Sequence, residues 1–278
     1  MGLDTYVPSL WAPGLLEPLY KNLVFGSVVN RDYEGMIRQM GDSVRINEIG
    51  NVTISDYTKY GGLSWQELES AQKTLLIDQA SSFAFAIDDV DAVQAAGKDA
   101  MSKATRNAGY GIGDEIDQHI AGLYTDAGIT VTAITATASN ILEWVADCAE
   151  ALSEANAIGT RWMIIPPKLH TVMLLAVTGG INNLAVPKLF DASTLANGYV
   201  GNLYGFNILL SNNVQTSSST VHQPLFFTSD AISFAGQLTK VKAVEREDYF
   251  DEGLKGLYVY GSKVVRPAVL GTSAVTKA

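Results

Sequence analysis

A long alanine-rich segment at residues 90–124 constrains the fold more than any other part of the sequence. Small or apolar residues recur at every fourth position in it, at Ala92, Ala96, Ala100, Ala104, Ala108, Ile112, Ile116 and Ile120. Because an α-helix turns once every 3.6 residues, a stripe of period four winds around the helix. The pattern predicts a helix about 50 Å long that is contacted on several sides. Gly109, Gly111 and Gly113 predict a bend or break in it.

Alternating apolar side chains predict strands at residues 43–55 and 75–87, on either side of a polar segment. The alternating residues are Val44, Ile46, Val52 and Ile54 in the first strand and Phe83, Phe85 and Ile87 in the second. The segment between them, 56–72, is polar and contains Gly61-Gly62. We expect a two-stranded excursion with a flexible tip. Because an isolated two-stranded ribbon is marginal in water, it should rest on another surface.

Shorter helices and strands follow in irregular order. A threonine-rich segment at residues 128–139 predicts a strand, and Asn140 with Glu143 predicts a capping box that opens a helix. The apolar face of that helix would consist of Ile141, Val145, Cys148 and Leu152. We expect a buried strand at 161–167, ended by two prolines, and a helix at 168–176.

The last part of the chain is rich in strand patterns. Residues 225–248 and 253–271 both predict strands, the second broken by glycines. The order of helices and strands follows no repeat. The sequence therefore predicts a mixed α+β fold rather than a doubly wound α/β fold.

The balance of charge limits the partners of the chain. Its 278 residues carry 19 Lys and Arg against 29 Asp and Glu, a formal net charge of −10. This acidic balance works against binding to nucleic-acid phosphates or to anionic lipid. Charged residues make up only 17% of the chain, below the usual share of about 25%, which favours a surface buried against copies of the same chain.

The amino-terminal residues indicate an extended arm. Pro8, Pro13 and Pro18 recur in residues 1–42, and proline fixes φ and removes a hydrogen-bond donor. The arm could pack on its own domain or on a neighbouring chain. We expect neither a signal peptide nor a membrane span. A single cysteine, Cys148, fits a reducing compartment.

Motifs for catalysis or metal binding are weak throughout. Ser70 and Lys73 match the S-x-x-K pattern of serine β-lactamases, without the K-T-G motif that accompanies it. Glu115 and His119 stand four apart and could share a metal, although a solvated helix face is the simpler interpretation. Cys148 lies on an apolar helix face, where a small buried hydrophobe is expected. The sequence therefore predicts neither an enzyme nor a bound cofactor or metal.

Residues 197–214, NGYVGNLYGFNILLSNNV, carry spaced glycines and an apolar run but no acid, base or thiol. Together with DAISFAGQLTKVKAVEREDYF and GLKGLYVYGSKVVRPAVL, they resemble the closing half of major capsid proteins of tailed double-stranded-DNA bacteriophages, which have the Hong Kong 97-type fold. The shared features are a Gly-x-x-Gly turn, an aromatic-led strand ending in Ser-Asn, a Tyr-Gly pair and a Val-Val-x-Pro ending. They stand here at Gly198 to Gly201, Phe206 to Asn212, Tyr260-Gly261 and Val264 to Pro267.

The resemblance implies a division of the chain into five parts. Residues 1–42 would be the N-terminal arm, 43–88 the extended loop with its flanking strands, and 89–128 the spine helix of the peripheral domain. Residues 129–235 would form the axial domain. Residues 236–278 would return to the peripheral domain and the C-terminus.

The resemblance also implies a function in assembly. Copies would associate as hexamers and pentamers into an icosahedral shell around the double-stranded DNA genome of the virion, without sequence-specific DNA binding. Assembly would take place in the host bacterial cytoplasm, with a separate scaffolding protein and a portal protein as further partners. Binding of a decoration protein is left open.

The candidate intersubunit contacts are Trp11 in the arm and Tyr57, Tyr60, Gly61, Gly62 and Trp65 in the extended loop. Large aromatic side chains in a loop without a core of its own are suited to contacts between chains. One alternative is an encapsulin-like nanocompartment shell, which shares the fold and would enclose protein cargo. Another is a homo-oligomeric serine hydrolase built on Ser70, for which Ser70→Ala would abolish turnover.

Overall fold

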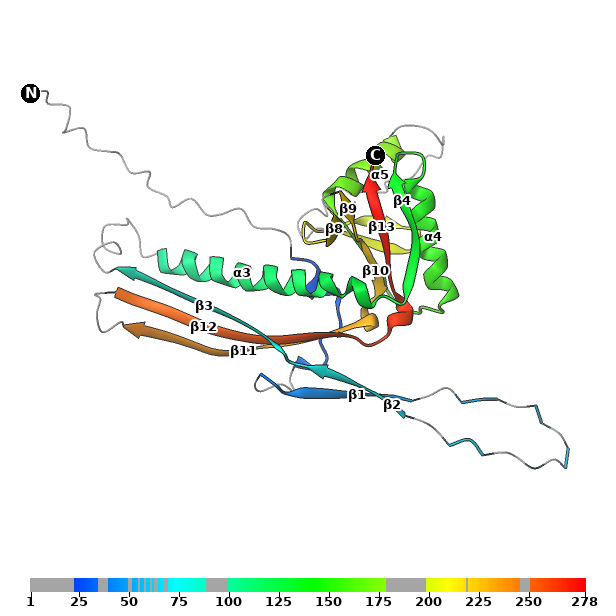
Figure 1. The fold of residues 1–278 in the computed structure, drawn as a ribbon, viewed down its shortest axis with the longest axis horizontal. Helices are drawn as coiled ribbons and strands as arrows, with labels where there is room; N and C mark the ends of the chain where they lie inside the picture. The colour runs from blue at the N-terminus through cyan, green and yellow to red at the C-terminus, as the bar shows by residue number, and fades with distance from the viewer. Residues whose placement is uncertain are drawn as a thin grey trace, which may run out of the picture.

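A computed structural model shows an elongated molecule with two sheets and a projecting two-stranded ribbon (Figure 1). The structure describes residues 23–34, 40–49, 52–54, 56–57, 59–60, 62, 65–67, 70–88, 100–178, 199–218, 220–245 and 251–278. Its helices are α1 (Phe25–Val28), α3 (Ala100–Gly122), η3 (Leu123–Asp126), α4 (Ile141–Glu154), α5 (Pro167–Thr178), η5 (Ser229–Ala231) and η6 (Pro267–Val269). Its strands are β1 (Ser43–Ile49), β2 (Ser70–Leu76), β3 (Gln79–Asp88), β4 (Ile129–Ala136), β5 (Arg161–Ile165), β6 (Tyr199–Leu203), β7 (Phe206–Leu210), β8 (Thr216–Ser218), β9 (Val221–His222), β10 (Leu225–Thr228), β11 (Ile232–Glu245), β12 (Asp251–Val264) and β13 (Leu270–Lys277).

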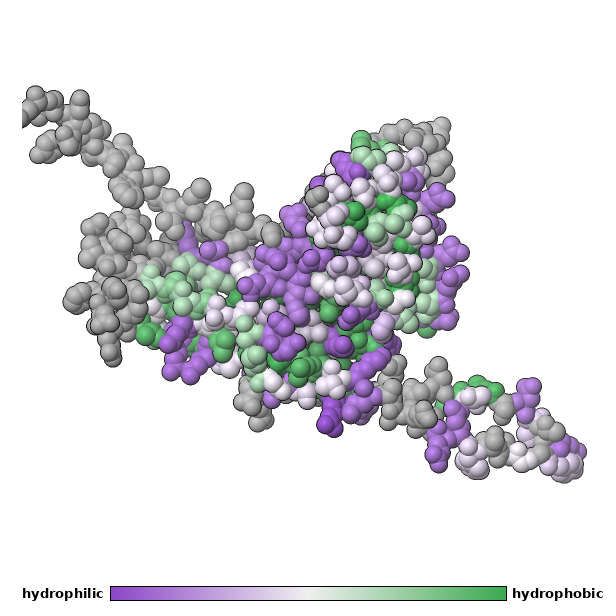
Figure 2. Space-filling view, in the orientation of Figure 1, coloured by the Kyte–Doolittle hydropathy of each residue, from purple (hydrophilic) through white to green (hydrophobic). Residues whose placement is uncertain are grey.

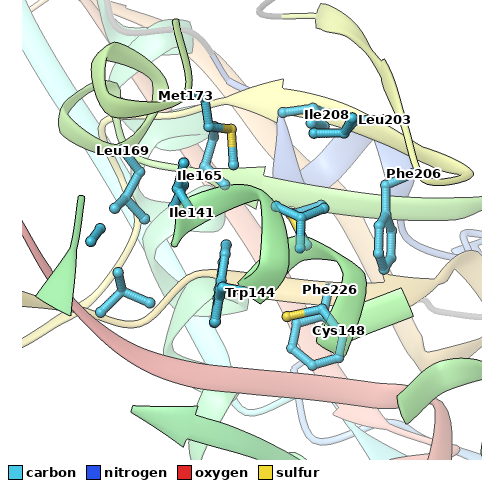
Figure 3. Close-up of a cluster of buried hydrophobic side chains, with 14 of the residues drawn as sticks. Ile141, Trp144, Cys148, Ile165, Leu169, Met173, Leu203, Phe206, Ile208 and Phe226 are labelled. Carbon is cyan, nitrogen blue, oxygen red and sulfur yellow. The ribbon is translucent and has the colours of Figure 1, made fainter. Parts of the chain in front are cut away.

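The larger sheet has eight strands among the described residues, in the order β6-β7-β5-β10-β13-β9-β8, with β4 paired to β13. Helices α4 and α5 cover one face of it and enclose a core that includes Trp144, Cys148, Phe206 and Phe226 (Figure 3). The Trp144 indole N–H donates a hydrogen bond to the Ser273 hydroxyl of β13 at 3.1 Å. This contact ties α4 to the strand at the centre of the sheet.

The strands expected at residues 128–139 and 161–167 are confirmed as β4 and β5, and the helix expected at 168–176 is confirmed as α5. Burial of Cys148 is also confirmed, since its side chain is fully enclosed in the core of α4 and α5. Periodicity located these elements because each packs one face on a core within the same chain.

Helix α4 begins at Ile141 as expected, but a capping box is not what opens it. The Asn140 side chain makes no cap hydrogen bond to the helix. Its Oδ1 accepts a hydrogen bond from the Thr137 N–H at 2.8 Å, and its Nδ2 donates to the Thr135 carbonyl oxygen at 2.9 Å. The Asn140 side chain therefore stabilises the turn before the helix instead of capping the helix.

The second sheet has three long strands in the order β11-β12-β3, and α3 lies along one face of it (Figure 1). The Ser81 hydroxyl of β3 donates a hydrogen bond to the Glu115 carboxylate of α3. The rings of His119 and Tyr260 meet edge-on, with centroids 5.5 Å apart. Ile120 is buried in a core that α3 shares with the larger sheet. The helix thus connects the two sheets.

Helix α3 runs without a break from Ala100 to Gly122, so the break expected at its glycines is wrong. A Cβ at Gly109 or Gly111 would meet nothing within 4 Å, whereas Gly113 lies against Leu23. Each glycine weakens helix formation by about 1 kcal/mol relative to alanine. Packing against the sheet and α1 supplies the stability that the local sequence lacks. The expected start of this helix lies outside the described residues.

Strand β12 is likewise continuous, although its glycines predict interruptions. Gly253, Gly256 and Gly261 all lie within it. A Cβ at Gly261 would overlap the backbone carbonyl group of Leu76, at the end of β2. Glycine within a strand often marks a site where another backbone approaches closely. Here it lets β2 cross directly over β12.

Strands β1 and β2 pair antiparallel, with Ser43 opposite Leu76 and Ile49 opposite Ser70, and form the projecting ribbon. The expected ribbon is present, but its second strand was predicted at residues 75–87 and is formed by Ser70–Leu76. Residues 79–88 form β3, which pairs with β12 and not with β1. Alternation shows that a segment is a strand, but not which strand it joins.

Two further expectations need correction at the amino-terminal side of the chain. Val52 and Ile54 lie beyond the end of β1 rather than within a strand. Residues 25–28 form the short helix α1, where an extended arm was expected, while residues 1–22 lie outside the described residues. None of the helices in the described ranges is long and apolar enough to cross a membrane.

Candidate assembly surfaces

The ribbon loop, residues 50–69 between β1 and β2, carries the most exposed aromatic side chains that the structure describes. Tyr57, Tyr60 and Trp65 are 79%, 92% and 94% exposed. Figure 2 shows the loop projecting away from the rest of the molecule. Trp65 therefore does not fold back on its own domain.

Two contacts lie within the described part of the ribbon loop. The Thr53 N–H donates a hydrogen bond to the Gln66 side-chain oxygen at 2.8 Å, across the two arms of the loop. The Lys59 ammonium group lies over the Tyr60 ring, 5.1 Å from its centroid. Gly62 is exposed, with nothing within 4 Å of a Cβ placed there. The remaining candidates, Trp11 and Gly61, lie outside the described residues.

The base of the ribbon, in contrast, is fixed firmly to the second sheet. Val44, Leu75 and Ile77 form a small core with Ala235 and Val259 of that sheet. The Lys73 ammonium group of β2 donates a hydrogen bond to the Val265 carbonyl oxygen. The structure thus combines a rigid base with an uncovered tip.

Asp117 of α3 anchors the backbone at α1, a role that no local sequence pattern indicates. Its carboxylate accepts backbone hydrogen bonds from Val24 at 2.6 Å, Phe25 at 3.3 Å and Gly26 at 3.1 Å. Burial raises the pKa of Asp117, while these three N–H donors act in the opposite direction. Val24 and Asp117 are 93 positions apart in the sequence. Local residue spacing could therefore not reveal this contact.

The Ser-Asn-Asn end of β7 also connects two parts of the fold. The Asn213 side-chain amide donates a hydrogen bond to the Asp114 carboxylate of α3 at 2.7 Å. The Ser211 hydroxyl accepts a hydrogen bond from the Asn213 N–H at 3.1 Å and shapes the turn. Gly205, with φ of 82°, forms the preceding hairpin turn together with Tyr204, with φ of 48°. Tyr204, Gly205 and Ser211 thus shape the turns before and after β7. Asn213 links the larger sheet to α3.

The residues considered for catalysis or metal binding have structural roles where the structure describes them. Lys73 binds a backbone carbonyl at the ribbon base, and Glu115 binds Ser81. His119 is half-buried against Tyr260, and its pKa is lowered by burial, with Asp78 opposing. No cluster of three or more metal-binding side chains occurs among the described residues. Burial raises the pKa of the Cys148 thiol, with Asp147 adding to the effect.

Comparison with known proteins points to one family. A family model described as phage capsid protein matches residues 72–270. A solved structure from Mycobacterium phage Che8 is 29% identical, with a TM-score of 0.78, and the match covers 98% of each chain. The capsid structure of cyanophage P-SCSP1u is 17% identical, with a TM-score of 0.73, covering 99% of this chain and 94% of that one. No curated protein sequence gives a significant match.

The same fold recurs at lower identity. The capsid of the Myoviridae phage XM1 is 13% identical, with a TM-score of 0.62, covering 95% of this chain and 96% of that one. The family match over residues 72–270 favours a phage shell over the nanocompartment and hydrolase alternatives. The chain belongs to the phage capsid protein family: it is a structural virion protein with the Hong Kong 97-type capsid fold, and its copies build the icosahedral shell.

Proposed function

We propose that the ribbon loop is a clamp between subunits, laid by each copy on a neighbouring copy within the hexamers and pentamers of the shell. The observation that carries this proposal is the exposure of Trp65, at 94%, on a loop whose described residues belong to none of the buried cores. Tyr57 and Tyr60 lie on the same loop. Aromatic side chains at the centre of an interface often contribute about 2 kcal/mol or more each.

The five-part division supports this assignment of roles. Residues 43–88 supply the clamp, and α3 within 89–128 is the spine that joins the two sheets. Residues 129–235 form most of the larger sheet, which we assign to the axial domain, and β13 within 236–278 completes that sheet. Trp11, in the arm of residues 1–42, and Gly61-Gly62 are proposed as further contacts between subunits.

Deleting the loop tests the clamp directly. Replacing residues 52–67 with a short Gly-Ser turn leaves β1 and β2 paired, so unassembled subunits should keep their secondary structure and melting temperature. Stable shells should not form, as judged by negative-stain images and sedimentation. Closed shells of normal stability would contradict the clamp, whereas an unfolded variant would place the loop in the subunit core.

A pair of point variants refines the test. Trp65→Ala should reduce the yield of closed shells by roughly thirtyfold, which corresponds to about 2 kcal/mol. Trp65→Phe keeps a large aromatic ring and should retain most of the yield. Equal losses in both variants would show that the contact depends on the indole N–H rather than on the buried ring area.

We further propose that assembly occurs in the host bacterial cytoplasm with a separate scaffolding protein and a portal protein, and that the shell encloses double-stranded DNA without reading its sequence. The net charge of −10 supports the absence of tight DNA binding. Co-expression with and without the neighbouring phage genes would test the need for a scaffold. Uniform closed shells from the chain alone would remove that need.

A further inference from the structure

Two turns at one end of the larger sheet present apolar side chains to solvent. The turn between α4 and β5 carries Ile158, which is 90% exposed, and the turn between β6 and β7 carries Tyr204, which is 53% exposed. Strands β5 and β7 pair in parallel, with Arg161 opposite Phe206. The turns that precede these two strands therefore lie at the same end of the sheet. We call Ile158 and Tyr204 together the turn surface.

The backbone before Ile158 ends α4 in a Schellman motif. Asn156 has a φ of 54°, and its N–H donates a hydrogen bond to the Ser153 carbonyl oxygen at 3.0 Å. The Ala157 N–H donates to the Leu152 carbonyl oxygen at 3.0 Å. The apolar pair that accompanies this motif is Ala157 with Leu152, and both belong to the core under α4 and α5. Ile158 follows the motif, so ending the helix does not require its side chain.

Arg161 holds the same turn from the other side. Its guanidinium group donates hydrogen bonds to the Ala157 carbonyl oxygen at 3.2 Å and to the Ser153 hydroxyl at 3.0 Å. Ile158 thus stands between a helix end and a strand start that are fixed to each other. A side chain held in place before binding loses less conformational freedom when it binds, which favours its use in a contact.

Tyr204 occupies a backbone conformation that disfavours it. Tyr204 and Gly205 have φ of 48° and 82°, and they connect Leu203 to its strand partner Phe206. Two-residue hairpin turns with positive φ at both positions prefer asparagine, aspartate or glycine at the first position. A bulky residue there is strained, and strained residues of this kind cluster at functional sites. Folding alone would favour asparagine, so the subunit by itself does not account for the tyrosine.

We propose that the turn surface packs on a second copy of the chain, the same neighbour that the ribbon loop contacts, an inference that rests on the proposed role of the loop as a clamp. Copies of the chain build a closed shell, so each copy has neighbours at its sides. Figure 1 shows that α4 ends on the side of the molecule toward which the ribbon projects. A neighbour held by the ribbon lies on that side, and the turn surface continues the same interface.

The two contacts have different consequences for assembly. A neighbour held only at the ribbon loop can still rotate about that contact. A second contact at the turn surface, on a different sheet of the subunit, fixes the angle between the two copies. A head-to-tail ring closes only when the rotation between copies has the right value. Loss of the turn surface should therefore leave subunits able to associate but unable to build regular shells.

Polar substitutions separate assembly from folding. In the double variant Ile158→Asn with Tyr204→Asn, one substitution lies at an exposed position and the other suits a positive φ. Unassembled subunits should melt at the same temperature or higher, while the yield of regular closed shells should fall by roughly tenfold. Negative-stain images should show open or irregular assemblies instead. The control, Ile158→Val with Tyr204→Phe, keeps the apolar area and should change neither quantity.

Thiol labelling tests burial of the turn surface directly. Cys148 is buried, so the thiol introduced by Ile158→Cys is the reactive one. A maleimide reagent should label it rapidly in unassembled subunits and roughly tenfold more slowly in closed shells, since reaction requires exposure. Equal rates in subunits and shells would overturn the inference.

The outcomes separate this inference from the clamp itself. If deletion of the ribbon loop still permits normal shells, the clamp is wrong. If deletion abolishes shells but the double asparagine variant builds regular shells at normal yield, the clamp stands and the turn surface is not an interface. Slow labelling of Ile158→Cys that appears only when other phage proteins are present would also overturn the inference, because it would assign the turn surface to one of those proteins.

Discussion

At the scale of single residues, buried polar groups organise this subunit more than surface ion pairs do. The side chains of the pairs Arg31–Glu34 and Arg266–Asp230 are one third to two thirds exposed, and solvent-accessible pairs of this kind contribute little. Asp117 is only 2% exposed and accepts hydrogen bonds from three backbone N–H groups at α1. Its removal would leave buried donors without acceptors.

We predict that Asp117→Asn lowers the free energy of unfolding by about 1–3 kcal/mol, because an amide nitrogen cannot accept a hydrogen bond and leaves a buried N–H unpaired. Urea unfolding of unassembled subunits would measure the loss. Asp147→Asn, at an exposed position on α4, is the matched control and should change stability by less than about 0.5 kcal/mol. Equal effects in the two variants would refute the anchor.

At the scale of elements, the direction of the ribbon is fixed where β2 crosses β12. Gly261 lies beneath the Leu76 carbonyl group, and the Lys73 hydrogen bond to Val265 holds the same crossing. The obstacle to a larger residue is backbone, which cannot rotate aside as a side chain can. The crossing therefore sets how the clamp projects from the subunit.

Gly261→Ala should force β2 away from the sheet and cost about 1–3 kcal/mol, the usual range for overpacking. Thermal melting of unassembled subunits would measure the cost, and shell yield would report the altered ribbon. Gly109→Ala on α3 provides the contrast, since its Cβ meets nothing within 4 Å and alanine favours a helix by up to about 1 kcal/mol. If Gly261→Ala changes neither the melting temperature nor the shell yield, β2 does not pack closely on β12 at this crossing.

At the scale of the whole molecule, burial makes the subunit sensitive to acid. Burial lowers the pKa of all three histidines, His119, His170 and His222, below the ordinary value of 6.5. Lys168 adds to the effect at His222, whose ring nitrogens have no hydrogen-bond partner among the described residues. The unfolded chain therefore binds protons more readily than the folded one in this range.

The free energy of unfolding should consequently fall as pH drops from about 7 through 6.5 toward about 5. Asp117 acts in the opposite direction, because its raised pKa favours proton uptake by the folded state above 3.8. Urea unfolding at stepped pH would show the net slope, and His222→Gln should reduce it. Stability that stays constant or rises over this interval would contradict the prediction.

Local sequence patterns were sufficient to predict the mixed α+β class and to point to the family. Apolar periodicity located α4, α5, β4 and β5, because each buries one face in a core of the same chain. The glycine-punctuated segments after residue 197 led to the capsid fold through resemblance. The aromatic residues of the ribbon loop could be singled out because no core pattern surrounds Tyr57, Tyr60 or Trp65.

Which helices and strands contact one another became clear from the folded chain alone. It assigned residues 79–88 to β12 rather than to β1, carried α3 through its glycines, and turned Asn140 away from its helix. It also brought Asp117 to the backbone of Val24 and placed the turns of Ile158 and Tyr204 at the same end of the larger sheet. These outcomes depend on contacts between residues far apart in the chain, whose energies local propensity does not contain, and so no pattern of neighbouring residues could reveal them.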